Sequence, residues 1–141
     1  MKAKISWDGE AKFIAESESK HRVLMDGPPE HGGENSGPRP MEMILMGMGG
    51  CAAFDVVYIL QKGHQNFIGC TVEVEATRAK EVPAVFTTIH LHFLVSGDNI
   101  KENTVRNAVK LSAEKYCSAS IMLRNGGVEI THSFKIVKSN S

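Results

Sequence analysis

The feature that most constrains this chain is a long apolar segment that begins at Pro40 and ends at Lys62, just before Gly63. Proline suits the first position of a helix, where its missing N–H leaves no hydrogen bond unmade, and glycine suits the position after the last turn. The sequence therefore predicts a helix over 40–62, about 34 Å long at 1.5 Å per residue. A helix that is apolar on all sides must be buried on all sides.

Two surroundings could bury such a helix, a membrane or a second subunit. The stretch Met41–Leu60 is long enough to cross a bilayer, but Asp55 within it would cost about 2.5–3.5 kcal/mol on insertion. A chain of 141 residues has limited material to surround the helix by itself, so we favour burial between two subunits. Small residues in the helix would let another backbone approach closely: Gly47, Gly49, Gly50, Ala52 and Ala53. We predict a homodimer with this helix at its centre and no membrane partner.

The remaining elements predict an α+β fold in a single domain over 1–141. Alternation of apolar and polar residues predicts strands over 2–7, 12–17, 22–25, 71–77, 85–95 and 128–137. A loop rich in Gly and Pro is expected over 26–38, and two further helices over 99–116 and from an N-cap at Ser118 to 125–127. This order lacks strict strand–helix alternation, so we expect antiparallel sheets.

Composition excludes one class of partner and indicates a reducing compartment. Sixteen Lys and Arg residues balance sixteen Asp and Glu residues, so no overall field attracts nucleic acid. The first residues contain no apolar run of the kind that a secretory signal carries. Three cysteines, an odd number without a CxxC pair, indicate free thiols in the cytoplasm rather than a disulfide framework.

The thiols are the side chains best suited to chemistry. Cys117 directly precedes the predicted helix at Ser118, where the positive helix end favours a thiolate, so local position makes Cys117 the better nucleophile. Cys51 lies in mid-helix, where activation requires a nearby cation or a polar pocket. Cys70 begins a predicted strand and is interpreted as structural. Since a buried Cys is most often a small apolar residue, a structural role also stays open for Cys51.

No bound cofactor and no metal site are expected. The glycines at 47–50 lie inside a helix and lack the spacing of a dinucleotide fingerprint. Four Met residues near Cys51 could offer soft ligands to Cu(I), but helical spacing scatters them around the axis, which favours core packing. His90 and His92 share one face of a predicted strand and could pair on a metal, but we interpret them as the polar side of a half-buried strand.

Two cysteine-containing segments are similar to segments of a known family. One runs from Pro40-Met41-Glu42 through the apolar helix to Cys51, and the other is Glu114-Lys115-Tyr116-Cys117-Ser118. Together with pieces such as Leu24-Met25-Asp26-Gly27 and Asp55-Val56-Val57, they resemble the OsmC/Ohr family, and within it the YhfA-type subgroup, over nearly the whole chain. The resemblance implies an intertwined α+β homodimer in which sheets wrap around long central helices.

The resemblance also implies a thiol-dependent peroxidase that reduces organic hydroperoxides in an oxidative stress response. Cys51 would be the peroxidatic residue, Cys117 would resolve it as a disulfide, and an external dithiol, often a dihydrolipoyl group in the family, would reduce that disulfide. The family's peroxidases carry a Glu at the position of Met41 and an Arg from an upstream loop, for which Glu42 and Arg39 are the nearest candidates here. The alternative is a non-catalytic protein of this fold that binds a hydrophobic ligand in the dimer cleft.

Overall fold

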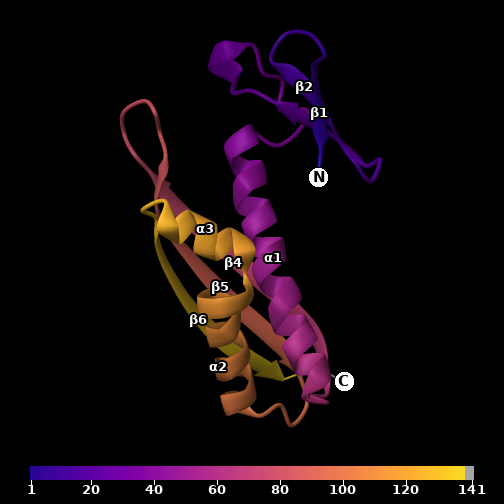
Figure 1. Ribbon diagram of the computed structural model, residues 1–141, viewed down its shortest axis with the longest axis vertical. Coiled ribbons are helices and arrows are strands. Elements are labelled where there is room, and N and C mark those ends of the chain that lie inside the picture. Colours follow the sequence, from indigo (N-terminus) through magenta and orange to yellow (C-terminus); the bar gives the residue numbers. More distant parts are fainter. Residues whose placement is uncertain (139–141) are drawn as a thin grey trace. The chain divides into compact units, whose positions relative to one another are not determined.

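The computed structural model describes residues 1–138, and the chain divides into two compact units, Met1–Leu45 and Met46–Ser141. Figure 1 labels most of the elements, which follow the order β1 (Ala3–Trp7), β2 (Lys12–Ser17), β3 (Arg22–Asp26), a 3-10 turn (Pro29–His31), α1 (Pro40–Lys62), β4 (Phe67–Arg78), β5 (Phe86–Gly97), α2 (Glu102–Leu111), a π-helical turn (Ser112–Tyr116), α3 (Ser118–Asn125) and β6 (Glu129–Lys138). The predicted α+β class and the predicted order of strands and helices are confirmed.

The N-terminal unit is an antiparallel sheet, β1-β2-β3, followed by the loop predicted from its Gly and Pro content. The loop is organised around Asp26, the last residue of β3, whose side chain is buried. Its Oδ2 accepts the backbone N–H groups of Glu34 at 2.9 Å and Ser36 at 3.1 Å. These donors, that of Glu34 first, hold the pKa of Asp26 below its ordinary value. The loop is therefore folded back onto the end of the sheet.

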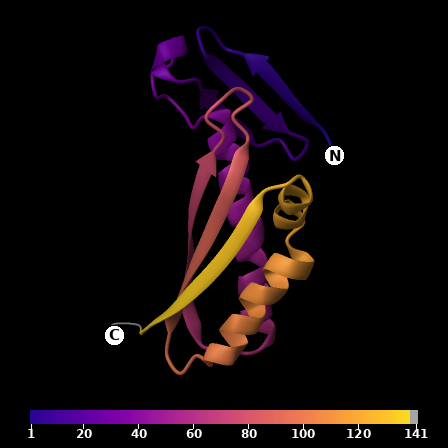
Figure 2. The same cartoon turned by 90° about the vertical axis from the view of Figure 1, so that its left-hand side faces the viewer.

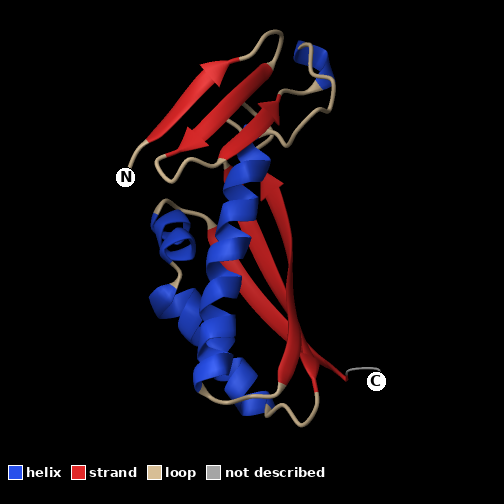
Figure 3. Cartoon of the chain, turned by 90° about the vertical axis from the view of Figure 1, so that its right-hand side faces the viewer, coloured by secondary structure: helices blue, strands red, loops and turns tan. Residues whose placement is uncertain are grey.

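The second unit is a three-stranded sheet with helices packed on one face, as Figures 2 and 3 show. Strands β4 and β5 form the predicted antiparallel hairpin. Strand β6 pairs with β5 in parallel, with Thr88 opposite Glu129 and Gly97 opposite Lys138, so the expectation of purely antiparallel sheets is wrong at this edge. The cause is the connection, because α2, the π-helical turn and α3 return the chain to the end of the sheet at which β5 began.

The core of this unit lies between the sheet and the helices. Alternate residues of β5 are buried, which leaves His90 and His92 on the opposite, more polar face, as predicted. A Cβ placed on Gly49 would lie 3.1 Å from Cγ2 of Val74, so α1 packs closely on β4. The fully buried apolar residues of the sheet and of the first two helices are Ile89, Leu91, Phe93, Val95, Met48, Ala52, Val56, Leu60, Val105, Ala108 and Val109.

Helix α1 has the predicted bounds but is not covered on all sides by its own chain. Gly47, Gly50, Phe54 and Tyr58 follow one stripe at helical spacing and are exposed, Phe54 to 70%. By length and composition α1 could cross a membrane, a criterion that core helices of soluble proteins also meet. Only 28% of its most apolar window is buried within the described residues, so much of this apolar surface has no partner in the chain.

Two helix boundaries differ from the sequence expectation. Helix α2 begins at Glu102 and not at 99, because Asn99 adopts a left-handed conformation with φ of 54° that a helix excludes. Helix α3 was expected to have Ser118 as its N-cap, but the N-cap is Cys117 and Ser118 is the first helical residue. The Cys117 thiol accepts the backbone N–H of Ser120, the bond that a serine cap would otherwise provide.

Candidate functional site

The structure brings Cys51 and Cys117 together and adds a third group, Asp55. The two sulfur atoms and one Asp55 carboxylate oxygen all lie within 4.8 Å of one another. Both cysteines are free thiols, with Cys51 half-buried and Cys117 fully buried. The two residues, distant in sequence, therefore form one site.

Local backbone geometry sets this arrangement. Cys51 and Asp55 are four residues apart on α1, so their side chains lie on the same face one turn apart. Cys117 follows the π-helical turn Ser112–Tyr116, which the Cys117 N–H closes by bonding the Ser112 carbonyl at 2.8 Å. Single π turns of this kind occur often at functional sites, because they move one residue out of the regular helical register.

The electrostatics of Cys117 differ from the sequence expectation. Its position at the start of α3 was expected to favour the thiolate, but burial raises the pKa of the Cys117 thiol, and the neighbouring Cys51 raises it further. The hydroxyl of Ser120 donates to the Cys117 sulfur at 3.0 Å and its N–H donates at 3.4 Å, and these bonds act in the opposite direction. Burial is the largest of these causes, and it favours the neutral form of the Cys117 thiol.

Asp55 is the site residue that sequence reasoning missed. Burial raises the pKa of its carboxyl group, and the Ser112 hydroxyl, 3.5 Å from Oδ2, partly opposes that shift. The same hydroxyl donates to the Ala52 carbonyl at 3.1 Å, which joins α1 to the π-helical turn. The signal was available, since Asp55 is the only acidic residue between Glu42 and the end of α1 and follows Cys51 by one turn.

An apolar cavity of about 450 Å³ opens beside Asp55. Its other lining residues are Phe54, Tyr58, Ile59, Leu111 and Tyr116, so Asp55 is its one charged group. The Asp55 carboxylate that lines this cavity is the one that lies against both thiols. A small organic molecule with a polar end could therefore place that end near the sulfur atoms.

The other two predicted site residues belong to the N-terminal unit. Glu42 accepts the backbone N–H of Arg39 at 2.8 Å, which satisfies the first free donor of α1. The Arg39 guanidinium donates to the side-chain oxygen of Asn35 at 3.0 Å. In the described residues both side chains thus have partners at the start of the helix, and their catalytic roles stay predictions.

The third thiol, Cys70, stands apart from this cluster. It lies on β4 opposite Val95 of β5, and burial raises the pKa of its thiol.

His90 and His92 both bond the Ser133 hydroxyl, at 2.9 and 2.6 Å, and His90 also bonds Thr131 at 2.6 Å. Hydroxyl groups from β6 therefore partner the two imidazoles, which agrees with their interpretation as the polar face of the sheet.

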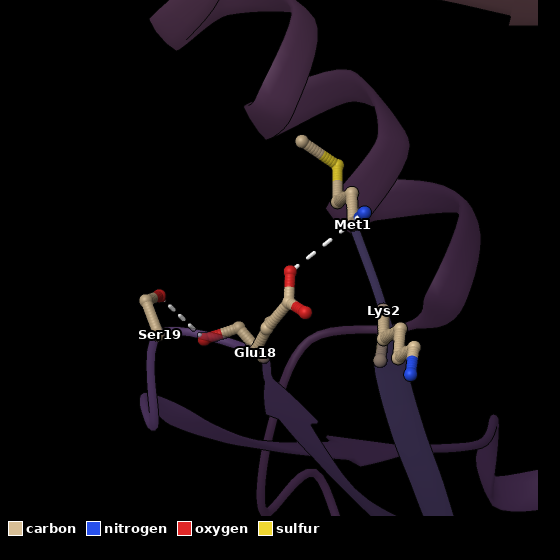
Figure 4. Close-up of a pocket in the computed structure, with 6 residues that line it drawn as sticks. Met1, Lys2, Glu18 and Ser19 are labelled. Atoms are coloured by element: carbon tan, nitrogen blue, oxygen red, sulfur yellow. Dashed lines mark hydrogen bonds and ion pairs between the residues drawn. The ribbon is translucent and has the colours of Figure 1, made fainter.

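Another cavity, of about 630 Å³, lies in the N-terminal unit. Figure 4 shows its labelled residues, among which the Met1 ammonium group lies 3.7 Å from the Glu18 carboxylate. Its lining also includes Ala3 and two serines, with no cysteine or histidine. An exposed ion pair of this kind contributes little to stability. Because its lining has neither a thiol nor an imidazole, this cavity is not the candidate site.

Comparisons with known proteins cover the region that holds both cysteines. Residues 33–133 match the family model described as OsmC-like protein. The chain is 49% identical over 140 residues to protein YhfA of Escherichia coli K12, an alignment that covers 97% of this chain and 98% of that protein. A solved structure from structural genomics is 45% identical, with a TM-score of 0.89 over 99% of this chain and 100% of that chain. An organic hydroperoxide resistance protein OsmC from Legionella pneumophila shares the fold, with a TM-score of 0.69 at 19% identity over 94% of each chain.

Proposed function

We propose that this chain, which belongs to the OsmC-like protein family, is a thiol-dependent peroxidase that reduces organic hydroperoxides through Cys51 and Cys117. The observation that carries the proposal is the pair of free thiols held within 4.8 Å of each other beside an apolar cavity. The family and the fold shared with an organic hydroperoxide resistance protein support a redox or stress protein in general. The specific reaction rests on the geometry of the two thiols.

The burial of each sulfur suggests which one reacts first. Cys51 is half-buried and Cys117 is fully buried, so a substrate reaches Cys51 more easily. The Cys51 thiolate attacks one peroxide oxygen, the O–O bond breaks, and the alkoxide leaves and takes a proton to become the alcohol. Cys51 is then a sulfenic acid. The Cys117 sulfur displaces its oxygen as water, which forms the Cys51–Cys117 disulfide.

An external dithiol completes the cycle by thiol–disulfide exchange, so no bound cofactor is required. One thiol of the reductant attacks the disulfide, the second displaces the protein sulfur, and the reductant leaves as its own disulfide. Such a cycle needs a compartment in which Cys70 and the resting thiols stay reduced, and we place the protein in the cytoplasm for that reason.

The cavity favours organic substrates over hydrogen peroxide. Its walls are mostly aromatic and aliphatic, and burial of a substrate's apolar part there contributes about 25 cal/mol per Å² of surface removed from water. Hydrogen peroxide has no apolar part to bury. The alternative function, storage or transport of a hydrophobic ligand, uses the same cavity and needs neither thiol.

The exposed stripe of α1 supports a homodimer as the working form. Phe54 and Tyr58 are large apolar residues on that stripe, and both also line the cavity. Contiguous exposed apolar surface of this kind marks interaction sites. A second copy of the chain that covers the stripe would also complete the wall of the cavity.

The test is thiol mapping by intact mass after one equivalent of an organic hydroperoxide is added to the fully reduced protein. We expect loss of two hydrogens, localised to a Cys51–Cys117 bridge, with Cys70 still free. Cys51→Ser should abolish peroxide consumption, and Cys117→Ser should stop at the sulfenic acid. The matched control Cys70→Ser should react as the unaltered protein does.

Three free thiols and an unchanged mass would overturn the peroxidase proposal. Co-purification of a hydrophobic molecule, detected by native mass spectrometry, would then favour the ligand-binding alternative. A bridge that includes Cys70 would contradict the assignment of the two site cysteines.

A further inference from the structure

We propose that the reduced protein binds a zinc ion through Cys51, Asp55 and Cys117. These residues supply two sulfur atoms and one carboxylate oxygen, all within 4.8 Å of one another. Among the described residues they form the one group of three or more His, Cys, Asp or Glu side chains with such spacing. The inference concerns the reduced thiols and does not depend on any reaction with peroxide.

The separations fit tetrahedral coordination after a small adjustment. Bonds of about 2.3 Å to sulfur and 2.1 Å to oxygen place the ligand atoms about 3.6–3.8 Å apart around a tetrahedral ion. Rotations that close the present spacing by up to about 1.2 Å are within the reach of side chains, because Cys51 and Asp55 already lie one turn apart on the same face of α1.

Neighbouring groups already orient two of the three ligands. The Ser120 hydroxyl and N–H both point at the Cys117 sulfur, at 3.0 and 3.4 Å, and would stabilise it as a thiolate ligand. The Ser112 hydroxyl lies 3.5 Å from Asp55 Oδ2 and is fixed on the Ala52 carbonyl. Metal ligands are usually held by such outer partners.

The donor set selects the kind of metal. Two thiolates exclude magnesium and calcium, which prefer oxygen ligands, and a carboxylate is a poor ligand for the softer Cu(I). Zinc accepts both donor types. Three protein ligands leave the fourth position open, and the cavity beside Asp55 gives a path by which the ion and a water molecule could enter.

The first experiment titrates the reduced full-length protein with Zn²⁺ against a chromophoric chelator, and with Co²⁺ as a spectroscopic probe. We expect one ion per chain and, for Co²⁺, a sulfur-to-metal charge-transfer band with the visible absorption of a tetrahedral ion. Cys51→Ser, Cys117→Ser and Asp55→Asn should each weaken binding by at least about tenfold, a loss comparable to that for disturbed metal sites. Cys70→Ser, the matched control, should bind as the unaltered protein does.

A second measurement needs no variant and so does not depend on how the variants fold. One equivalent of Zn²⁺ should slow alkylation of Cys51, and an excess of chelator should restore the original rate. Absence of bound metal, unchanged affinity in both site-cysteine variants, or loss of binding in Cys70→Ser would overturn the proposal. Failure of the peroxide reaction together with intact zinc binding would reject the peroxidase function and leave the zinc site standing.

Discussion

Replacing Gly50 by Ala tests whether a second chain covers the exposed stripe of α1. Gly50 is exposed within the chain, and a Cβ built on it meets no atom within 4 Å. In a helix that stays open to solvent on this side, Gly to Ala is favourable by about 1 kcal/mol, because Gly has the greater freedom to lose. For a chain without a partner on this face, we therefore expect Gly50→Ala to raise the free energy of unfolding.

A second helix packed against Gly50 would turn this expected gain in stability into a loss. An extra methyl group in a close-packed contact costs about 1–3 kcal/mol, which exceeds or cancels the gain from helix propensity. The gain from helix propensity is present in the free subunit and in the dimer alike, so the packing cost of about 1–3 kcal/mol per chain falls on association, and each 1.4 kcal/mol weakens association about tenfold. We expect Gly50→Ala to raise the dimer dissociation constant by about tenfold or more.

The assay pairs sedimentation equilibrium with urea unfolding at matched protein concentrations. Gly47→Ala, three residues earlier on the same stripe and also open within 4 Å, should change association in the same direction. Gly49→Ala is the matched control, because its Cβ would lie 3.1 Å from Val74 of the same chain and away from the exposed stripe, so it should have no specific effect on association. A Gly50→Ala protein that is about 1 kcal/mol more stable than the unaltered protein and monomeric at micromolar concentration would show that the stripe has no partner.

Two further predictions concern the N-terminal unit. The pKa of Asp26 is lowered in the folded protein, so its contribution to stability is present above the unfolded pKa of about 4 and is lost as the pH falls through the lower folded value. Urea unfolding between pH 2 and 6 should therefore show a loss of stability in acid, and Asp26→Asn should make that loss shallower. An equal dependence of stability on pH in the two proteins would contradict this. Glu42→Ala should lower the free energy of unfolding by about 1 kcal/mol, because the hydrogen bond from the Arg39 N–H is lost. Glu42→Gln should keep most of that stability, since the Gln side-chain oxygen can accept the same bond. Equal losses of stability in the two variants would show that the charge of Glu42, and not the cap, matters.

The elements set by local sequence could be predicted well. Pro40 and Gly63 mark both ends of α1, and simple alternation places His90 and His92 on the polar face of β5. Local geometry also explains one miss, because Asn99 adopts a left-handed conformation, which Asn tolerates better than most residues, and this delays the start of α2. These features depend on neighbours in the sequence.

The features that depend on distant pairing could not be read from the sequence. The direction of β6 is decided by where the crossover through α2 and α3 ends, and periodicity carries no information about that. The proximity of Cys51 and Cys117 came from a family resemblance and not from spacing. Asp55 was missed because the sequence argument used it only as a charge that disfavours membrane insertion. Its proximity to Cys117, which lies elsewhere in the chain, is set by the tertiary fold.

The parallel pairing of β6 with β5 has a consequence for how the protein is made. Partners such as His90 and Thr131 are 41 residues apart, so closing this part of the sheet carries a larger entropy loss than forming the β4–β5 hairpin. Cys117 lies on the crossover that must close. A chain still emerging from the ribosome therefore displays Cys51 without its partner sulfur, and we expect the thiol pair to form only after the β4–β5 hairpin.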